Sequence, residues 1–140
     1  MTDSGWEQFE VEADVGLRGW GSSRAEAVAQ LTLGVFSLIA APASIEVRER
    51  REVRAQAEGP EALLVAWVDE CLYVHEIEGF VVHAVEMTVF TDGLAHGYLH
   101  GEALDLARHR IGGVVKGATH HRTSLTVRDG LHEARLIVDV

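Results

Sequence analysis

Two Asp-Gly pairs divide the second half of this sequence into β-hairpins. Asp92-Gly93 and Asp129-Gly130 each lie between segments in which apolar and polar residues alternate. An Asp-Gly pair favours the tight turn that joins two antiparallel strands, because both positions tolerate positive backbone φ angles. The chain after residue 80 is therefore expected to form mainly strands. The expected strands cover residues 80–91, 94–104, 114–119, 123–127 and 131–140, with a loop at 106–113.

The first half carries the signals of two helices. Ser23 and Glu26 are spaced as in a capping box, in which the two side chains satisfy free amide groups at a helix start. Apolar residues then recur at helical spacing until Pro42, which cannot continue the helix. A second helix is expected to start at Pro60 and to end at Gly79. Strands are expected at 6–12, 15–20 and 44–58.

The order ββαβα followed by strands predicts an α+β fold. In it, two helices pack on a mixed, mostly antiparallel sheet to form a two-layer sandwich. Residues 1–140 contain no visible linker or repeat, so a single domain is expected. A chain of this length, 47% hydrophobic, can bury a core without a disulfide or a structural zinc. Cys71, the one cysteine, lies on the apolar stripe of the second helix and is expected to be buried and inert.

The chain is acidic, with 22 Asp and Glu against 12 Lys and Arg and a formal net charge of −10. Affinity for nucleic acid comes largely from neutralising phosphates, so weak or no direct nucleic acid binding is expected. A basic protein partner or a metal cation suits the charge better. Residues 1–5 do not resemble a signal peptide, and the apolar stretch 31–43 is too short to span a bilayer. These features predict a cytoplasmic protein with no membrane partner.

The eight histidines do not predict a zinc site. His96 and His100 share one face of an expected strand, but they lie about 13 Å apart at roughly 3.3 Å per residue. Zinc–nitrogen bonds of about 2 Å cannot bridge that distance. His120 and His121 are adjacent, so in a strand they would point to opposite faces. We expect these histidines to be surface or hydrogen-bonded residues.

One acidic pair is more informative. Asp14 lies between the first two expected strands, and Asp139 is the penultimate residue of the last one, beside the carboxylate of Val140. Aspartate is depleted in strands. If the last strand pairs near the first, three hard oxygen donors converge, a set that suits Ca²⁺, Mg²⁺ or Mn²⁺. Spacing alone leaves solvated turn residues as the other interpretation.

The order of several short motifs resembles the archease family nearly from end to end. No single motif is specific to the family, but the order of the motifs and their spacing along the chain are specific. The motifs are the N-terminal segment 6–16, the helical segment 63–73, His109, the segment 115–121 and the terminal segment 137–140.

Several properties follow from this resemblance rather than from composition or spacing. Archeases activate the RtcB-class RNA ligase, which joins tRNA halves after intron removal, and they promote guanylylation of the ligase's histidine and repeated turnover. The family's metal ligands correspond to Asp14, Asp139 and the terminal carboxylate of Val140. The resemblance thus implies a single archease-like domain that is not itself an enzyme. We expect it to bind a divalent cation, Ca²⁺ first, with Mg²⁺ or Mn²⁺ as alternatives.

Further residues are expected near the partner. Lys116, His121 and His109 are the candidates for contact with the ligase. The chain departs from the family at Val11, where members usually carry histidine, and this departure puts the surroundings of the metal in question.

Two other functions stay open at this stage. In the first, the protein is a chaperone-like modulator of a tRNA methyltransferase, a role suggested for the family. In the second, it is a small metal-dependent hydrolase that uses Asp14 and Asp139. Two carboxylates on a hard cation can activate water. The sequence offers no clear general base for the hydrolase.

Overall fold

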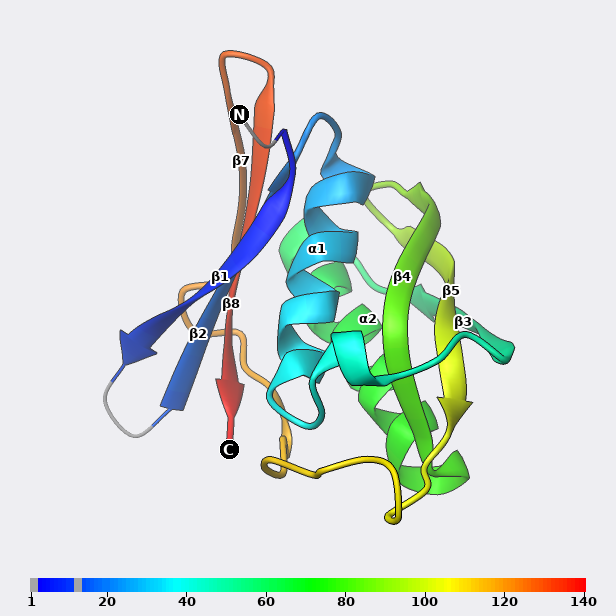
Figure 1. Ribbon diagram of the computed structural model, residues 1–140. Coiled ribbons are helices and arrows are strands. Elements are labelled where there is room, and N and C mark those ends of the chain that lie inside the picture. Colours follow the sequence, from blue (N-terminus) through cyan, green and yellow to red (C-terminus); the bar gives the residue numbers. More distant parts are fainter. Residues whose placement is uncertain (1–2, 12–13) are drawn as a thin grey trace.

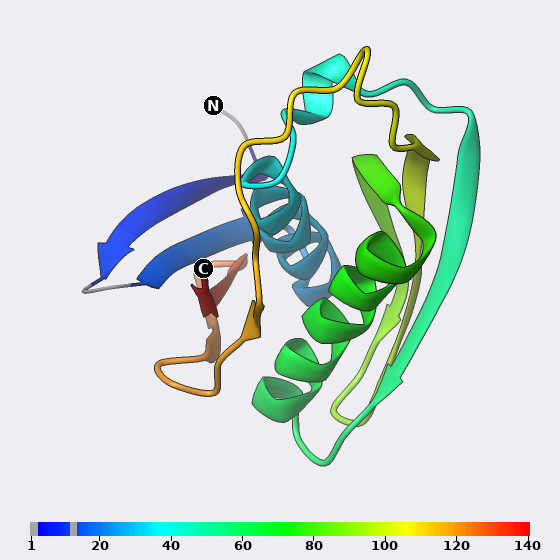
Figure 2. The same cartoon turned by 90° about the horizontal axis from the view of Figure 1, so that it is seen from below.

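The computed structural model describes residues 3–11 and 14–140, which form two sheets with a layer of helices between them (Figures 1 and 2). Helix α1 (Arg24–Ser37) packs against strands of both sheets, and α2 (Pro60–Glu78) lies mainly against the smaller sheet. A short 3₁₀ turn, η1 (Pro42–Ser44), follows α1. The expected α+β class with two helices is confirmed. The strands are divided into two sheets, and every pairing in the described residues is antiparallel.

The larger sheet contains both the first and the last strand of the described residues. Its order is β1-β2-β8-β6, and β7 also pairs with β8. Strand β8 therefore lies beside β2, although the two are at opposite ends of the sequence. The strands are β1 (Gly5–Val11), β2 (Asp14–Gly21), β6 (Gly117–Ala118), β7 (Ser124–Arg128) and β8 (Leu131–Asp139).

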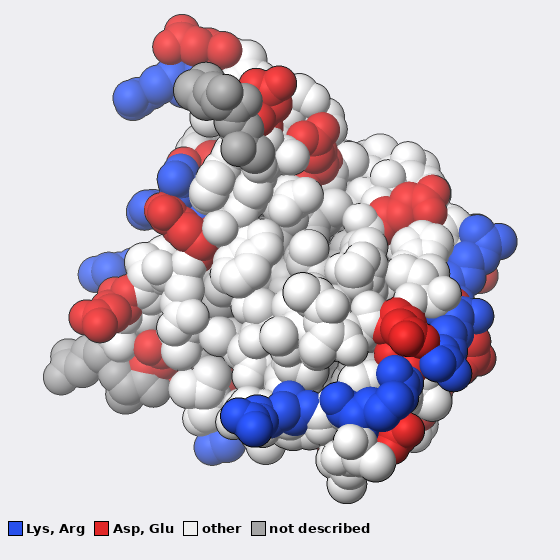
Figure 3. Space-filling model, viewed as in Figure 1, with Lys and Arg blue, Asp and Glu red and all other residues white. Residues whose placement is uncertain are grey.

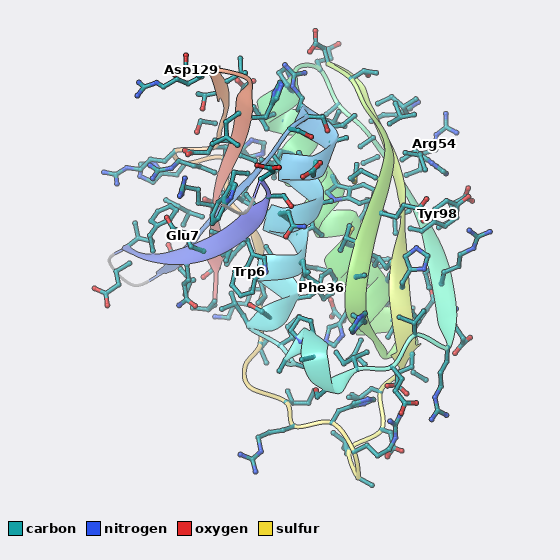
Figure 4. The ribbon with its side chains drawn as sticks, turned by 45° about the horizontal axis from the view of Figure 1, so that its top comes forward. Trp6, Glu7, Phe36, Arg54, Tyr98 and Asp129 are labelled. Carbon is teal, nitrogen blue, oxygen red and sulfur yellow. The ribbon has the colours of Figure 1, made fainter. Side chains whose placement is uncertain are left out.

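The smaller sheet has β5 (Leu94–Ala103) between β3 (Glu49–Gln56) and β4 (Phe80–Phe90). Its outer face carries polar and aromatic side chains, among them Tyr98 and Arg54 (Figure 4). Along this side of the molecule, basic side chains lie next to acidic ones and do not form an uninterrupted basic patch (Figure 3).

The local helix signals are confirmed, except that only the Ser23 half of the expected capping box forms. Ser23 is the N-cap of α1, and its hydroxyl accepts a hydrogen bond from the backbone N–H of Glu26 at 3.1 Å. The Glu26 carboxylate instead accepts from the hydroxyl of Ser22. Gly79 ends α2 with a φ angle of 62°, in the left-handed region that favours glycine.

Two expected strands are shorter than the sequence indicated. The segment expected at 44–58 forms a strand only at β3. Ser44 ends the 3₁₀ turn η1, and the N–H of Glu46 bonds to the side-chain carboxylate of Glu102 rather than to the backbone of β5. The segment expected at 114–119 forms only β6, where it meets the end of β8. Pairing partners far away in the sequence decide both limits.

The core lies between the sheets and among the helices. Leu17, Leu31, Trp67 and Leu99 are fully buried there. Cys71 is also fully buried, as expected, and burial raises the pKa of its thiol well above the ordinary value, with a smaller contribution from Glu70. Among the described residues, no helix is long and apolar enough to cross a membrane.

Candidate functional site

The predicted acidic pair lies at one end of the larger sheet. Asp14 is the first residue of β2, and Asp139 is the last residue of β8. The two strands run antiparallel, and their pairing ends with Val15 opposite Val138. Asp14 and Asp139 are the next residues on the two neighbouring strands. The fold thus brings the last strand beside the strand that starts with Asp14.

Both aspartates belong to the outer face of this sheet. Val138 is fully buried, and Val15 packs against the same core. Because successive side chains of a strand point to opposite faces, Asp14 and Asp139 are directed away from the helices. Asp139 is exposed and Asp14 is partly exposed. The pair therefore faces solvent, where a cation or a partner can reach it.

The donor set at this end of the sheet is small. Within residues 3–11 and 14–140, no three His, Cys, Asp or Glu side chains gather closely enough to hold a metal ion. A cation bound here would need Asp14, Asp139 and the terminal carboxylate of Val140, a residue that is 44% exposed. Carboxylate oxygens are the donors that Ca²⁺, Mg²⁺ and Mn²⁺ prefer, so the residues fit a hard cation in their chemistry.

Val11 lies directly opposite Asp14 in the β1–β2 ladder. This is the position at which the family resemblance led us to expect histidine. A valine side chain offers no ligand atom and no hydrogen-bond donor. The neighbourhood of Asp14 therefore lacks the imidazole that a histidine would have placed across from the carboxylate.

Lys116 is held close to the acidic pair through its main chain. Its N–H donates to the backbone oxygen of Asp139 at 2.7 Å, and the next residue, Gly117, pairs with Asp139. The Asp69 carboxylate on α2 accepts a hydrogen bond from the N–H of Ala118 at 2.8 Å. These bonds fix the end of β8 against β6 and α2, with the exposed Lys116 side chain at the same end of the sheet.

His121 and His109 are not brought to the acidic pair in the same way. His121 is exposed in the turn between β6 and β7. His109 is only 3% exposed. Its Nδ1 accepts from the N–H of Asp105, so its Nε2–H is the donor to Glu102 at 3.0 Å. Partner contact by either histidine stays a prediction, and the enclosed position of His109 supports a role in holding its loop.

Glu102 holds that loop in place, and no sequence pattern pointed to this role. It is 2% exposed, and its carboxylate binds Arg108, His109 and the N–H of Glu46. Burial alone would raise the pKa of Glu102, but these bonds together lower it from 4.5 to about 2. The buried charge thus ties the segment after β5 to the segment before β3.

The remaining histidine predictions are confirmed for the smaller sheet. His96 bonds to Glu52 at 2.8 Å, and His100 bonds to Glu86 at 2.9 Å. Each imidazole has its own carboxylate partner, and the two do not form a shared site. They are hydrogen-bonded surface residues, as expected.

The fold and the acidic pair define a small α+β protein with a candidate hard-cation site where its last strand meets its second. Comparison with known proteins gives the family. The model of the Archease protein family matches residues 6–140. The chain belongs to the archease family.

Individual relatives agree over nearly the full length. Protein archease of Thermococcus gammatolerans is 34% identical, with 96% of this chain and 98% of the relative covered. The same protein of Pyrococcus abyssi is 33% identical over the same shares. The solution structure of protein 1598 of Methanobacterium thermoautotrophicum is 30% identical, with a TM-score of 0.79 over 97% of this chain and 99% of that chain.

A more distant structure supports the fold alone. The crystal structure of an archease from Thermotoga maritima, described as a possible chaperone, is 13% identical. Its TM-score is 0.58 over 96% of each chain.

Proposed function

We propose that this chain is a non-enzymatic, metal-binding activator of an RtcB-class RNA ligase. It would promote guanylylation of the ligase's histidine and allow the ligase many turnovers in tRNA splicing or RNA repair. One juxtaposition supports the proposal. Asp14 and Asp139, which the family resemblance assigns to a metal, come from opposite ends of the sequence and lie at neighbouring strand ends.

The residues at this end of the sheet have separate parts in the proposal. Asp14, Asp139 and the Val140 carboxylate would bind the cation, which supplies positive charge for the phosphates of a nucleotide. The β2–β8 pairing sets the spacing of the two aspartates, and the bond from Lys116 holds the end of β8. The net charge of −10 favours encounter with a basic, RNA-handling enzyme.

The test is RNA ligation by the cognate ligase at limiting enzyme, with and without this protein. We expect the ligase to form many moles of ligated RNA per mole of enzyme only when the protein and a divalent cation are present. Asp139→Asn should abolish the gain, because the amide keeps the shape of the side chain but loses its charge. Asp129→Asn is the matched control, since Asp129 lies in an exposed hairpin turn with a φ of 54° that asparagine also adopts. Ligation that stays at a single turnover with the wild-type protein would refute the proposal.

A chaperone-like role is the second candidate, because the related Thermotoga maritima structure is described as a possible chaperone. Co-purification of a tRNA methyltransferase without the ligase would favour it. Metal-dependent phosphate release by the purified protein, lost in Asp14→Asn, would instead indicate a hydrolase.

A further inference from the structure

A groove opens between the C-terminal half of α2 and the segment 104–117, which leads into β6. Its volume is about 680 Å³. Figure 2 shows this segment running on the side of α2 that faces the larger sheet. Six of the thirteen lining residues are apolar and three are glycines; the apolar residues are Leu72, Tyr73, Leu104, Ile111, Val114 and Val115.

Several of these apolar side chains are left in water. Tyr73 is 59% exposed and Val114 is 73% exposed, one on each wall of the groove. Ile77, one helical turn after Tyr73, is 63% exposed and extends the apolar surface along α2. Scattered apolar residues are normal on a surface, but a contiguous group beside a groove is typical of an interaction site.

The charge around the groove identifies the chemistry of its occupant. Helix α2 carries five acidic residues and no lysine or arginine. Two of them, Asp69 and Glu76, line the groove itself, and Lys116 is the one lysine or arginine in the lining. An apolar channel with an acidic wall complements a segment that is apolar on one side and cationic on the other.

We propose that this groove binds a basic, amphipathic segment of a protein partner. Apolar side chains of the segment would fill the space between Tyr73 and Val114, and its Lys or Arg residues would face Glu76. The choice of partner rests on the proposed function, since the RNA ligase is the protein that must hold this chain in place. The backbone bond from Lys116 to Asp139 joins the groove wall to the acidic pair. A segment bound here would therefore hold the acidic pair against the same partner.

Binding can be measured directly with a model peptide. The probe is a fluorescent peptide of about 18 residues, five helical turns, with leucine and lysine arranged so that one helical face is apolar. A peptide of the same composition without an apolar face is the control for simple charge attraction. We expect the amphipathic peptide to bind at least about tenfold more tightly, as measured by fluorescence anisotropy.

Substitutions of exposed residues locate the site without destabilising the folded protein. Tyr73→Ala and Glu76→Lys should each weaken peptide binding by about tenfold. Val127→Ser and Glu58→Lys are the matched controls. Val127 is as exposed as Tyr73 but lies on β7, and Glu58 is exposed outside the groove. Both controls should leave the dissociation constant within about twofold.

Equal binding of the two peptides, or an effect of Tyr73→Ala no larger than that of Val127→Ser, would overturn the groove assignment. The assignment would also be overturned if single-stranded RNA displaces the peptide and the binding of that RNA depends on Tyr73. The ligase assay separates this inference from the proposed function. If Tyr73→Ala activates the ligase like the wild type at every concentration, the groove assignment fails and the proposed function stands. If the peptide binds in the groove but the wild type never activates the ligase, the proposed function fails and the groove stands.

Discussion

The two helices are joined through one buried polar contact, which gives a sharp test of the packing. The indole N–H of Trp67 on α2 donates to the hydroxyl of Thr32 on α1 at 3.0 Å. That hydroxyl in turn donates to the backbone oxygen of Val28 at 2.7 Å. Trp67 and Thr32 are both fully buried. The substitution Thr32→Val keeps the volume of the side chain but removes the only acceptor that the structure gives to the indole within the described residues.

The expected cost follows from the unpaired donor. A buried polar group without a partner costs about 1–3 kcal/mol. Valine and threonine have similar helix propensities, so the backbone adds little. We therefore expect Thr32→Val to lower the free energy of unfolding by about 2 kcal/mol. Thr32→Ser keeps the hydroxyl that accepts from Trp67, so it should lower the free energy of unfolding by less than Thr32→Val does.

Urea unfolding followed by circular dichroism measures the change as a shift of the midpoint at constant slope. In a chain that already carries Trp67→Phe there is no indole N–H to leave unpaired. Thr32→Val should then cost about 1 kcal/mol less than it does in the wild-type chain. An equal cost in both backgrounds would show that the hydrogen bond does not determine the effect, and the reasoning would be wrong.

Three further predictions concern other parts of the molecule. The pKa of Glu102 is about 2 in the folded chain against an ordinary 4.5, so its charge adds stability above pH 4.5 that is lost as the pH falls toward 2. Glu102→Gln should therefore flatten the dependence of the urea midpoint on pH in that range. A Cβ at Gly19 would lie 2.4 Å from the backbone nitrogen of Leu31, so Gly19→Ala should cost about 1–3 kcal/mol in urea unfolding. The control Gly93→Ala, with its nearest atom at 3.4 Å, should cost under about 0.5 kcal/mol. A C-terminal tag, which moves the free carboxylate away from Val140, should weaken cation binding in calorimetry without changing the unfolding midpoint, whereas an N-terminal tag should change neither. Equal behaviour of the two tags would exclude the terminal carboxylate as a ligand.

The elements themselves follow largely from local sequence. The cap at Ser23, the left-handed stop at Gly79 and the hairpin turn at Asp129-Gly130 lie where the sequence predicts them. These features depend on bonds and backbone angles within a few residues, so a local pattern is enough to predict them. The burial of Cys71 follows equally from the apolar stripe on its helix.

The division into two sheets could not be predicted from such patterns. An alternating segment identifies a strand but not its neighbour, and the neighbours of β8 lie far away in the sequence. The same limit explains why the expected strand at 114–119 shortens to β6, which extends only as far as its pairing with β8. Strand order depends on packing between distant segments, which no local pattern records.

The candidate site likewise combines features that the sequence determines with features that only the fold determines. The sequence by itself determined the acidic residues available, the excess of negative charge and the family to which the order of motifs points. Only the tertiary structure decided that Asp14 and Asp139 lie at neighbouring strand ends, that His109 is enclosed beside Glu102, and that Tyr73 faces a groove. The physical reason is that proximity and exposure of side chains arise from contacts between segments far apart in the chain. For the acidic pair, that contact is the pairing of β2 with β8.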